Sequence, residues 1–137
     1  MDPVTYILDT NVIADRIRRH PQVIARLTQA GEAGNILGLC DPVRYEVSRG
    51  LLKVDAEQKL KFFQIEISPL MEYLALTTDD WQEAARLWAI MRNQGRQFSD
   101  VDLLIAALAR RLDAVVVTAD ADFASLSVKS EDWRRSE

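Results

Sequence analysis

The sequence has few nucleophilic or metal-binding side chains other than carboxylates. Its 137 residues include one cysteine, Cys40, and one histidine, His20. A single cysteine excludes an internal disulfide and a cysteine-based zinc site, and its place after an apolar run is typical of a small buried hydrophobic residue. A single histidine excludes sites that need two imidazoles. Any hydrolytic chemistry would therefore depend on carboxylates and metal.

Long apolar runs are also absent, since no stretch approaches the ~18 residues of a membrane span. The start lacks the basic and apolar regions of a secretory signal, so we expect a cytoplasmic protein that does not contact a membrane. Hydrophobic residues make up 48% and charged residues 28% of the chain, as in folded domains. With no repeat or linker visible, we predict a single domain over residues 1–137, with a polar, frayed tail from about residue 128.

The net charge of −4 does not decide between functions. Nucleic-acid-binding domains are usually basic, which argues against that class. A site that gathers several acids around metal ions would itself lower the total charge. The charge is therefore compatible with either interpretation.

Apolar, β-rich segments alternate with helical patterns along the whole chain. Strands are predicted at residues 4–8, 35–40, 72–76 and 114–118. Helices are predicted at 11–19, 21–30, 42–52, 55–66, 79–93, 99–112 and 120–126, with Asp41 as the N-cap of the third. Trp81, Ala85, Trp88 and Met91 form a stripe that we expect in the core rather than on a surface that binds a partner. The alternation predicts an α/β fold with a mainly parallel sheet of four to five strands and helices on both faces. Such sheets place their sites beyond the carboxyl ends of the strands.

Four acids stand where a helix begins or could turn inward: Asp9, Glu46, Asp102 and Asp120. Each has a structural explanation by itself. Asp9 and Asp120 could cap helices, Asp102 could form a capping box with Ser99, and Glu46 could be a solvated helix residue. Capping does not require four acids to converge, however, whereas the predicted topology directs them toward one edge of the sheet.

Convergence of these acids has an energetic cost. Two carboxylates ~4 Å apart repel by ~1 kcal/mol in water and by ~4 kcal/mol at an effective dielectric of ~20. Four without counter-charge would consume much of the ~5–15 kcal/mol that stabilises a domain. A divalent cation removes this repulsion, and oxygen ligands suit Mg²⁺ or Mn²⁺ better than Zn²⁺.

Four segments in this order resemble one known family: YILDTNV at 6–12, YEVSRGL at 45–51, GRQFSDVDLLIAA at 95–107 and VVTADADF at 116–123. Together they resemble the PIN-domain ribonucleases and, among these, the VapC-type toxins of bacterial toxin–antitoxin modules. The resemblance covers nearly the whole chain. Two positions depart from the family pattern, since Asp41 replaces a frequent Ser or Thr and Gln97 a frequent proline. Neither is a principal metal ligand.

The resemblance implies a PIN-like three-layer α/β/α sandwich and a role for each acid. By it, Asp9, Glu46 and Asp102 are the principal metal-binding acids, Asp120 is the fourth, and Asp122 could hold a water or a second metal. Groups expected to orient the carboxylates or lie beside them are Thr10, Asn11, Ser99, Asp100 and Thr118.

The implied activity is that of a Mg²⁺- or Mn²⁺-dependent endoribonuclease that hydrolyses RNA with a metal-activated water. The resemblance further implies a type II toxin that forms a homodimer and is bound by a cognate antitoxin protein. Two alternatives stay open. One is a catalytically silent PIN-fold interaction module. The other is a haloacid-dehalogenase-like phosphatase, which requires an acid where this chain has Asn11. Basic residues beside the motifs could contact RNA phosphates or be solvated helix charges: Arg44, Arg49, Lys53 and Arg96.

Overall fold

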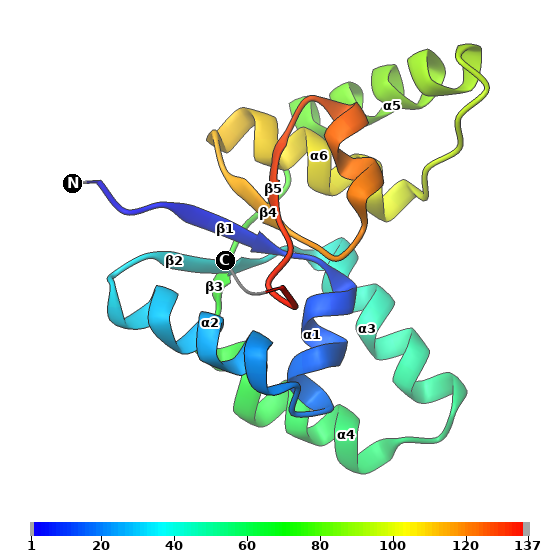
Figure 1. Cartoon of the computed structure of the whole chain (residues 1–137). Helices are drawn as coiled ribbons and strands as arrows, with labels where there is room; N and C mark the ends of the chain where they lie inside the picture. The colour runs from blue at the N-terminus through cyan, green and yellow to red at the C-terminus, as the bar shows by residue number, and fades with distance from the viewer. Residues whose placement is uncertain (1, 136–137) are drawn as a thin grey trace.

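A five-stranded parallel sheet forms the centre of the computed structural model, which describes residues 2–135. Its strands are β1 (Thr5–Leu8), β2 (Ile36–Leu39), β3 (Glu72–Tyr73), β4 (Val115–Val117) and β5 (Lys129–Glu131). They lie in the order β3-β2-β1-β4-β5, and each neighbouring pair is parallel (Figure 1). The chain moves outward from β1 on one side to β2 and β3, then crosses to β4 and β5. The strand order therefore reverses between β1 and β4, where parallel sheets place ligand sites.

Helices cover both faces of this sheet. They are α1 (Thr10–Ile17), α2 (Pro21–Glu32), α3 (Asp41–Lys53), α4 (Glu57–Phe62), α5 (Thr78–Asn93) and α6 (Asp100–Leu112), with short helical turns η1 (Phe63–Ile67), η2 (Ser68–Leu70) and η3 (Ala121–Leu126). In Figure 1, α5 and α6 lie above the strands and α1, α2 and α4 below. Helix α3 contacts both α1 and α6. The predicted three-layer α/β/α arrangement with a parallel sheet is confirmed.

The core lies between the sheet and these helices. Ile7 and Leu8 of β1 are fully buried because helices cover both faces, which explains why the strand is apolar almost throughout. Cys40 is also fully buried, and burial raises the pKa of its thiol to about 11. His20 caps α2, where its Nδ1 accepts a hydrogen bond from the Val23 amide at 3.4 Å. Neither residue is placed for catalysis. No helix among residues 2–135 is long and apolar enough to span a membrane.

The C-terminal segment is not frayed as the sequence suggested. Strand β5 pairs with β4, and Trp133 beyond it is buried. The Trp133 ring packs edge-on against Tyr6, and Arg134 bonds to the buried carboxylate of Asp15 at 3.0 Å. The polar composition of this segment gave no sign that the Trp133 ring and the Arg134 side chain would hold it against the rest of the domain.

Two further expectations about the limits of helices were wrong. Helix α3 starts at Asp41, with Cys40 at the N-cap position and no side-chain cap, because Pro42 fixes the first turn instead. The helix predicted at 55–66 ends at Phe62 and continues as the π-helical turn η1, which places Phe63 and Ile67 in the core.

The stripe predicted for the core lies mostly on the surface. Trp81 and Trp88 are 57% and 43% exposed, and Ala85 is exposed as well. Of the four residues, only Met91 is buried. Helix α5 buries a different face against α6, through Ala84 and Leu87. The error arose because tryptophan spacing alone does not identify which face of a helix is covered.

Candidate metal centre

Asp9 occupies the point where β1 ends and α1 begins, and its carboxylate is almost fully enclosed. The residue is 4% exposed. Its own amide donates to the Val117 carbonyl at 3.0 Å, which ties it to the end of β4. Oδ1 accepts the Thr10 amide at 2.8 Å, and Oδ2 accepts Thr118 Oγ1 at 2.8 Å and Asn11 Nδ2 at 3.1 Å. Three donors therefore occupy three of the about four acceptor positions of a carboxylate, and the remaining one is on Oδ1.

Asn11 and Thr118 hold this carboxylate in a network between the two central strands. Asn11 Nδ2 also bonds to Thr118 Oγ1 at 3.2 Å, and Asn11 Oδ1 accepts the Ala119 amide at 3.1 Å. The Thr118 hydroxyl in turn accepts the Asp120 amide at 3.0 Å. The predicted orienting residues thus connect Asp9 to Asp120 through a continuous chain of hydrogen bonds.

The carboxylates of Asp9, Glu46, Asp102 and Asp120 interact electrostatically. Burial and the neighbouring charge of Asp9 raise the pKa of Asp102 to about 6, with smaller contributions from Asp120 and Glu46. Burial also raises the pKa of Asp9, against hydrogen bonds from Thr118 and the Thr10 amide that lower it, while Glu46 and Asp120 raise it further. Acids separated by up to 111 positions in sequence therefore face one region of space.

We call these four residues the acid group. The two other predicted acids, Asp122 and Asp100, do not belong to it. Asp122 sits at the start of η3, where its amide bonds to Asp120 Oδ1 at 2.9 Å. Its carboxylate is exposed and lies 3.8 Å from Arg96 Nη2. Asp100 is exposed in the first turn of α6, and Ser99 caps that helix by accepting the Asp102 amide at 3.1 Å. Asp122 and Asp100 are therefore exposed, and Ser99 positions Asp102.

Three features of the acid group fit a hard divalent cation. Its donors are oxygens, and Asp9 Oδ1 retains a free acceptor position. Thr10 Oγ1 is buried and has no hydrogen-bond partner, which leaves an unsatisfied polar atom beside Asp9. Within residues 2–135, however, no three histidine, cysteine, aspartate or glutamate side chains are grouped closely enough to hold a metal ion as they lie.

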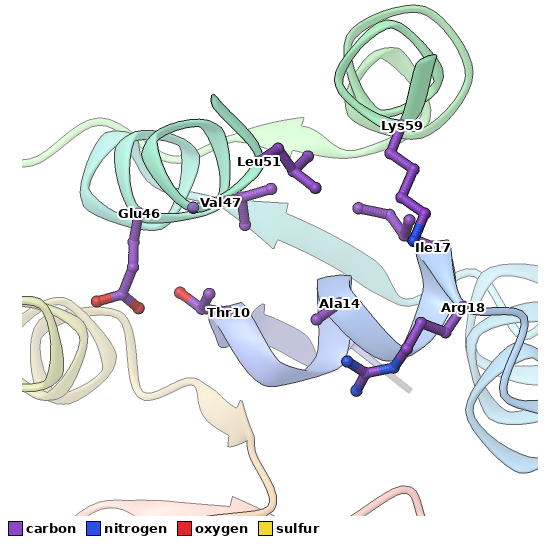
Figure 2. A pocket seen from close by; sticks show the side chains of 9 residues that line it. Thr10, Ala14, Ile17, Arg18, Glu46, Val47, Leu51 and Lys59 are labelled. Atoms are coloured by element: carbon purple, nitrogen blue, oxygen red, sulfur yellow. The ribbon is translucent and has the colours of Figure 1, made fainter. Parts of the chain in front are cut away.

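A groove leads away from the acid group between α1, α3 and α4. Its volume is about 220 Å³, and its floor is formed by Ala14, Ile17, Val47 and Leu51. Figure 2 shows Thr10 and Glu46 pointing toward one another at one end, with Arg18 and Lys59 at the other. One end of the groove is thus acidic and the other basic, with an apolar surface between them.

This architecture defines a family. The PIN domain model matches residues 6–129, and the chain belongs to the PIN-domain family. The family assignment made from the four sequence motifs is therefore confirmed.

Within that family, several of the similar proteins are of the VapC type. Ribonuclease VapC19 of Mycobacterium tuberculosis (strain CDC 1551 / Oshkosh) is 27% identical over 114 residues, which cover 83% of this chain and 87% of the relative. The fold matches VapBC2 from Rickettsia felis, a complex bound to a DNA fragment from its promoter, with a TM-score of 0.82, 24% identity and coverage of 93% and 98%. It also matches M. tuberculosis VapC20, a sarcin–ricin loop cleaving toxin, with a TM-score of 0.69, 20% identity and coverage of 90% and 95%.

Sequence reasoning missed one contact that bears on the site. Asp15 lies on α1, the helix that begins beside Asp9, and it is buried and paired with Arg18 and Arg134. The pair with Arg134 joins residues 119 positions apart. A charged residue within an amphipathic helix gave no signal that it faces inward.

Proposed function

We propose that this protein is a metal-dependent endoribonuclease that uses Asp9, Glu46, Asp102 and Asp120 to bind Mg²⁺ or Mn²⁺. The observation that carries the proposal is that these acids lie within electrostatic reach of one another: Glu46 and Asp120 act on Asp9, and Asp9, Asp120 and Glu46 add to the burial that chiefly raises the pKa of Asp102. A folded protein gains nothing from such repulsion unless a cation compensates it. The names of the VapC19 and VapC20 relatives support a ribonuclease in particular.

When bound, a divalent cation would neutralise charge on the phosphodiester and lower the pKa of a coordinated water. The protein's own contribution is to orient the acids. Thr118, Asn11 and the Thr10 amide fix the Asp9 carboxylate and leave one acceptor position free on Oδ1. Ser99 fixes the start of α6 and with it Asp102. The raised pKa of Asp102 predicts weaker metal binding below about pH 6, because protonation removes a ligand.

Cleavage of a mixed RNA pool tests this activity directly. Wild-type protein should cleave RNA with Mg²⁺ or Mn²⁺ and stop with EDTA, and the products should carry 5′-phosphate and 3′-hydroxyl ends. Asp9→Asn and Asp102→Asn should each abolish cleavage, whereas Asp113→Asn, an exposed residue at the far end of α6, should not. Metal-independent cleavage, or full activity of both variants, would exclude the proposed chemistry.

Two further measurements, thermal unfolding with metal and detection of a phosphorylated aspartate, separate the alternative functions. A silent interaction module would neither cleave RNA nor gain thermal stability from Mg²⁺ or Mn²⁺. A phosphatase of the haloacid-dehalogenase type would form a covalent aspartyl-phosphate on Asp9. Three hydrogen-bond donors already occupy the Asp9 carboxylate, which favours a fixed ligand over an attacking nucleophile.

The groove between α1, α3 and α4 supports a second part of the proposal, an antitoxin partner that reaches the acid group. Its apolar floor and basic end suit a peptide with apolar and acidic residues. Expression of this chain should arrest bacterial growth, and coexpression of its antitoxin should restore it. Leu51→Glu should prevent rescue without loss of RNA cleavage. Ile65→Glu, at an exposed site on η1, should leave rescue intact.

The exposed tryptophans of α5 support a homodimer. Trp81, Ala85 and Trp88 line a hollow of about 290 Å³ together with Leu103 and Leu104 of α6. Clustered exposed tryptophans are typical of protein interfaces. Light scattering should give twice the chain mass for the wild type, and Trp88→Glu should reduce the mass to that of a monomer. A monomeric wild type would exclude the dimer.

A further inference from the structure

Two arginines lie beside carboxylates: one beside Glu46 of the acid group, and one beside Asp122, two residues from Asp120. Arg49 Nη2 is 3.4 Å from Glu46 Oε2 on α3. Arg96, in the segment that precedes α6, lies 3.8 Å from Asp122 Oδ1 on η3. Helix α6 contacts both α3 and η3, so the two guanidinium groups flank the elements that carry the acids.

Each guanidinium packs against an aromatic ring, and each side chain is still reached by solvent. Arg49 lies 5.0 Å from the centre of the Tyr45 ring, and Arg96 lies 5.5 Å from that of Phe98. Arg96 also hydrogen-bonds to Ser125 Oγ. The side chains nevertheless remain 55% and 40% exposed. Contact with an aromatic face restricts an arginine without using its hydrogen-bonding capacity.

Stability does not explain these two ion pairs. Exposed pairs contribute ~0–1 kcal/mol, and both distances exceed the ~2.7–2.9 Å of strong charge-assisted hydrogen bonds. A phosphate can replace the carboxylate in such a pair, because a guanidinium binds either group with the same two-pronged geometry. Both arginines are therefore restrained but available to another anion.

RNA has a specific need for such groups at this site. The acid group repels a polyanionic strand, and the whole chain carries a net charge of −4. We infer that Arg49 and Arg96 bind the RNA phosphates on either side of the linkage that faces the acid group. The inference rests on the proposed function and assigns the path of the substrate backbone, from α3 across the start of α6 to η3.

Binding of a fluorescein-labelled single-stranded RNA to the non-cleaving Asp102→Asn protein tests this assignment. In that background, Arg49→Ala and Arg96→Ala should each weaken binding about tenfold. Each should also reduce the slope of log affinity against log salt by about 0.7, the value for one phosphate contact on a single strand. Arg49→Lys and Arg96→Lys should retain most of the slope.

Arg86→Ala is the matched control, because Arg86 forms the same i,i+3 pair with Glu83 at 2.9 Å on α5. It should change neither the affinity nor the salt slope. In otherwise wild-type protein, the Arg49 and Arg96 variants should raise KM about tenfold while kcat stays within about twofold.

The outcomes separate this inference from the proposed function. Cleavage with unchanged RNA affinity and salt slope in both arginine variants would overturn the assignment and leave the nuclease intact. Loss of affinity in the Arg86 variant equal to that in the other two would also overturn it. No cleavage by wild-type protein, with the arginine effects on binding preserved, would overturn the nuclease and leave RNA binding.

Discussion

Asp102→Asn should make the metal-free protein more stable at neutral pH, although it removes a residue of the acid group. The pKa of Asp102 is raised from 3.8 to about 6 in the folded state, mainly by burial and then by Asp9. A raised pKa means that the carboxyl group favours folding while it is protonated. This contribution is complete below about pH 3.8 and is lost as the pH rises through about 6. At pH 7.5 the charged carboxylate opposes folding, whereas asparagine cannot.

The size of the effect follows from the shift. About two pKa units correspond to about 3 kcal/mol. Because the carboxyl group is only half-buried, solvent screening reduces this to about 1–2 kcal/mol. At pH 4 the difference between the variant and the wild type should nearly disappear. With Mg²⁺ or Mn²⁺ at a hundred times its dissociation constant, the wild type should gain about 2.7 kcal/mol and the order should reverse.

Urea unfolding followed by tryptophan fluorescence measures these differences, at pH 4 and 7.5, with EDTA or with metal. Asp100→Asn is the control, because it makes the same change two residues earlier on α6 at an exposed position. It should lose only the ~0.3–1 kcal/mol of an acid at a helix N-terminus. An Asp102→Asn protein no more stable than wild type at pH 7.5 in EDTA would refute the reasoning. So would equal stabilisation of both proteins by metal.

Three further predictions concern stability and are checked by urea or thermal unfolding. Gly38→Ala should lower the free energy of unfolding by about 1–3 kcal/mol, because an added Cβ would lie 2.6 Å from Leu74 Cγ. An unchanged free energy of unfolding would show that the Leu74 side chain can move aside. Trp133→Ala should lower the free energy of unfolding by about 3–5 kcal/mol, because Trp133 is buried. A loss as small as that from substituting an exposed residue would contradict its role as an anchor. Burial raises the pKa of Asp15, but hydrogen bonds from Arg134 and Arg18 outweigh burial, so the pKa is lowered. The ionised Asp15 carboxylate therefore stabilises the fold above about pH 4, and this contribution is lost as the pH falls further. Asp15→Asn should therefore lower the free energy of unfolding by about 3 kcal/mol at pH 7 and weaken its dependence on pH below about 4. An unchanged pH dependence would exclude the ion pairs of Asp15 as its cause.

The sequence was sufficient to predict the fold class because buried parallel strands are apolar throughout. The runs that became β1, β2 and β4 needed no tertiary information. Strand β5 could not be predicted, since Lys129–Glu131 is polar and forms only because β4 offers a free edge. The exposed face of α5 could not be predicted either, because a tryptophan stripe has the same spacing in a core and at an interface.

The acid group was more predictable than its surroundings. Strand ends reveal Asp9 and Asp120, since a polar residue after an apolar strand is easily seen in sequence. Asp122 illustrates the limit. It is two residues from Asp120, but the turn into η3 directs its carboxylate toward Arg96 instead. Spacing alone does not determine such a direction.

The order in which the four acids occur along the chain has a consequence for its synthesis. Asp9 is made early, but its hydroxyl donor Thr118 and the neighbouring acid Asp120 follow it by 109 and 111 residues. Strand β4 also pairs directly with β1, so the central pair of strands closes only after the chain has been made as far as Val117. A nascent chain that has not reached Asp120 therefore lacks the complete centre, and any activity that depends on this centre begins only after that residue has been added and β4 has paired with β1.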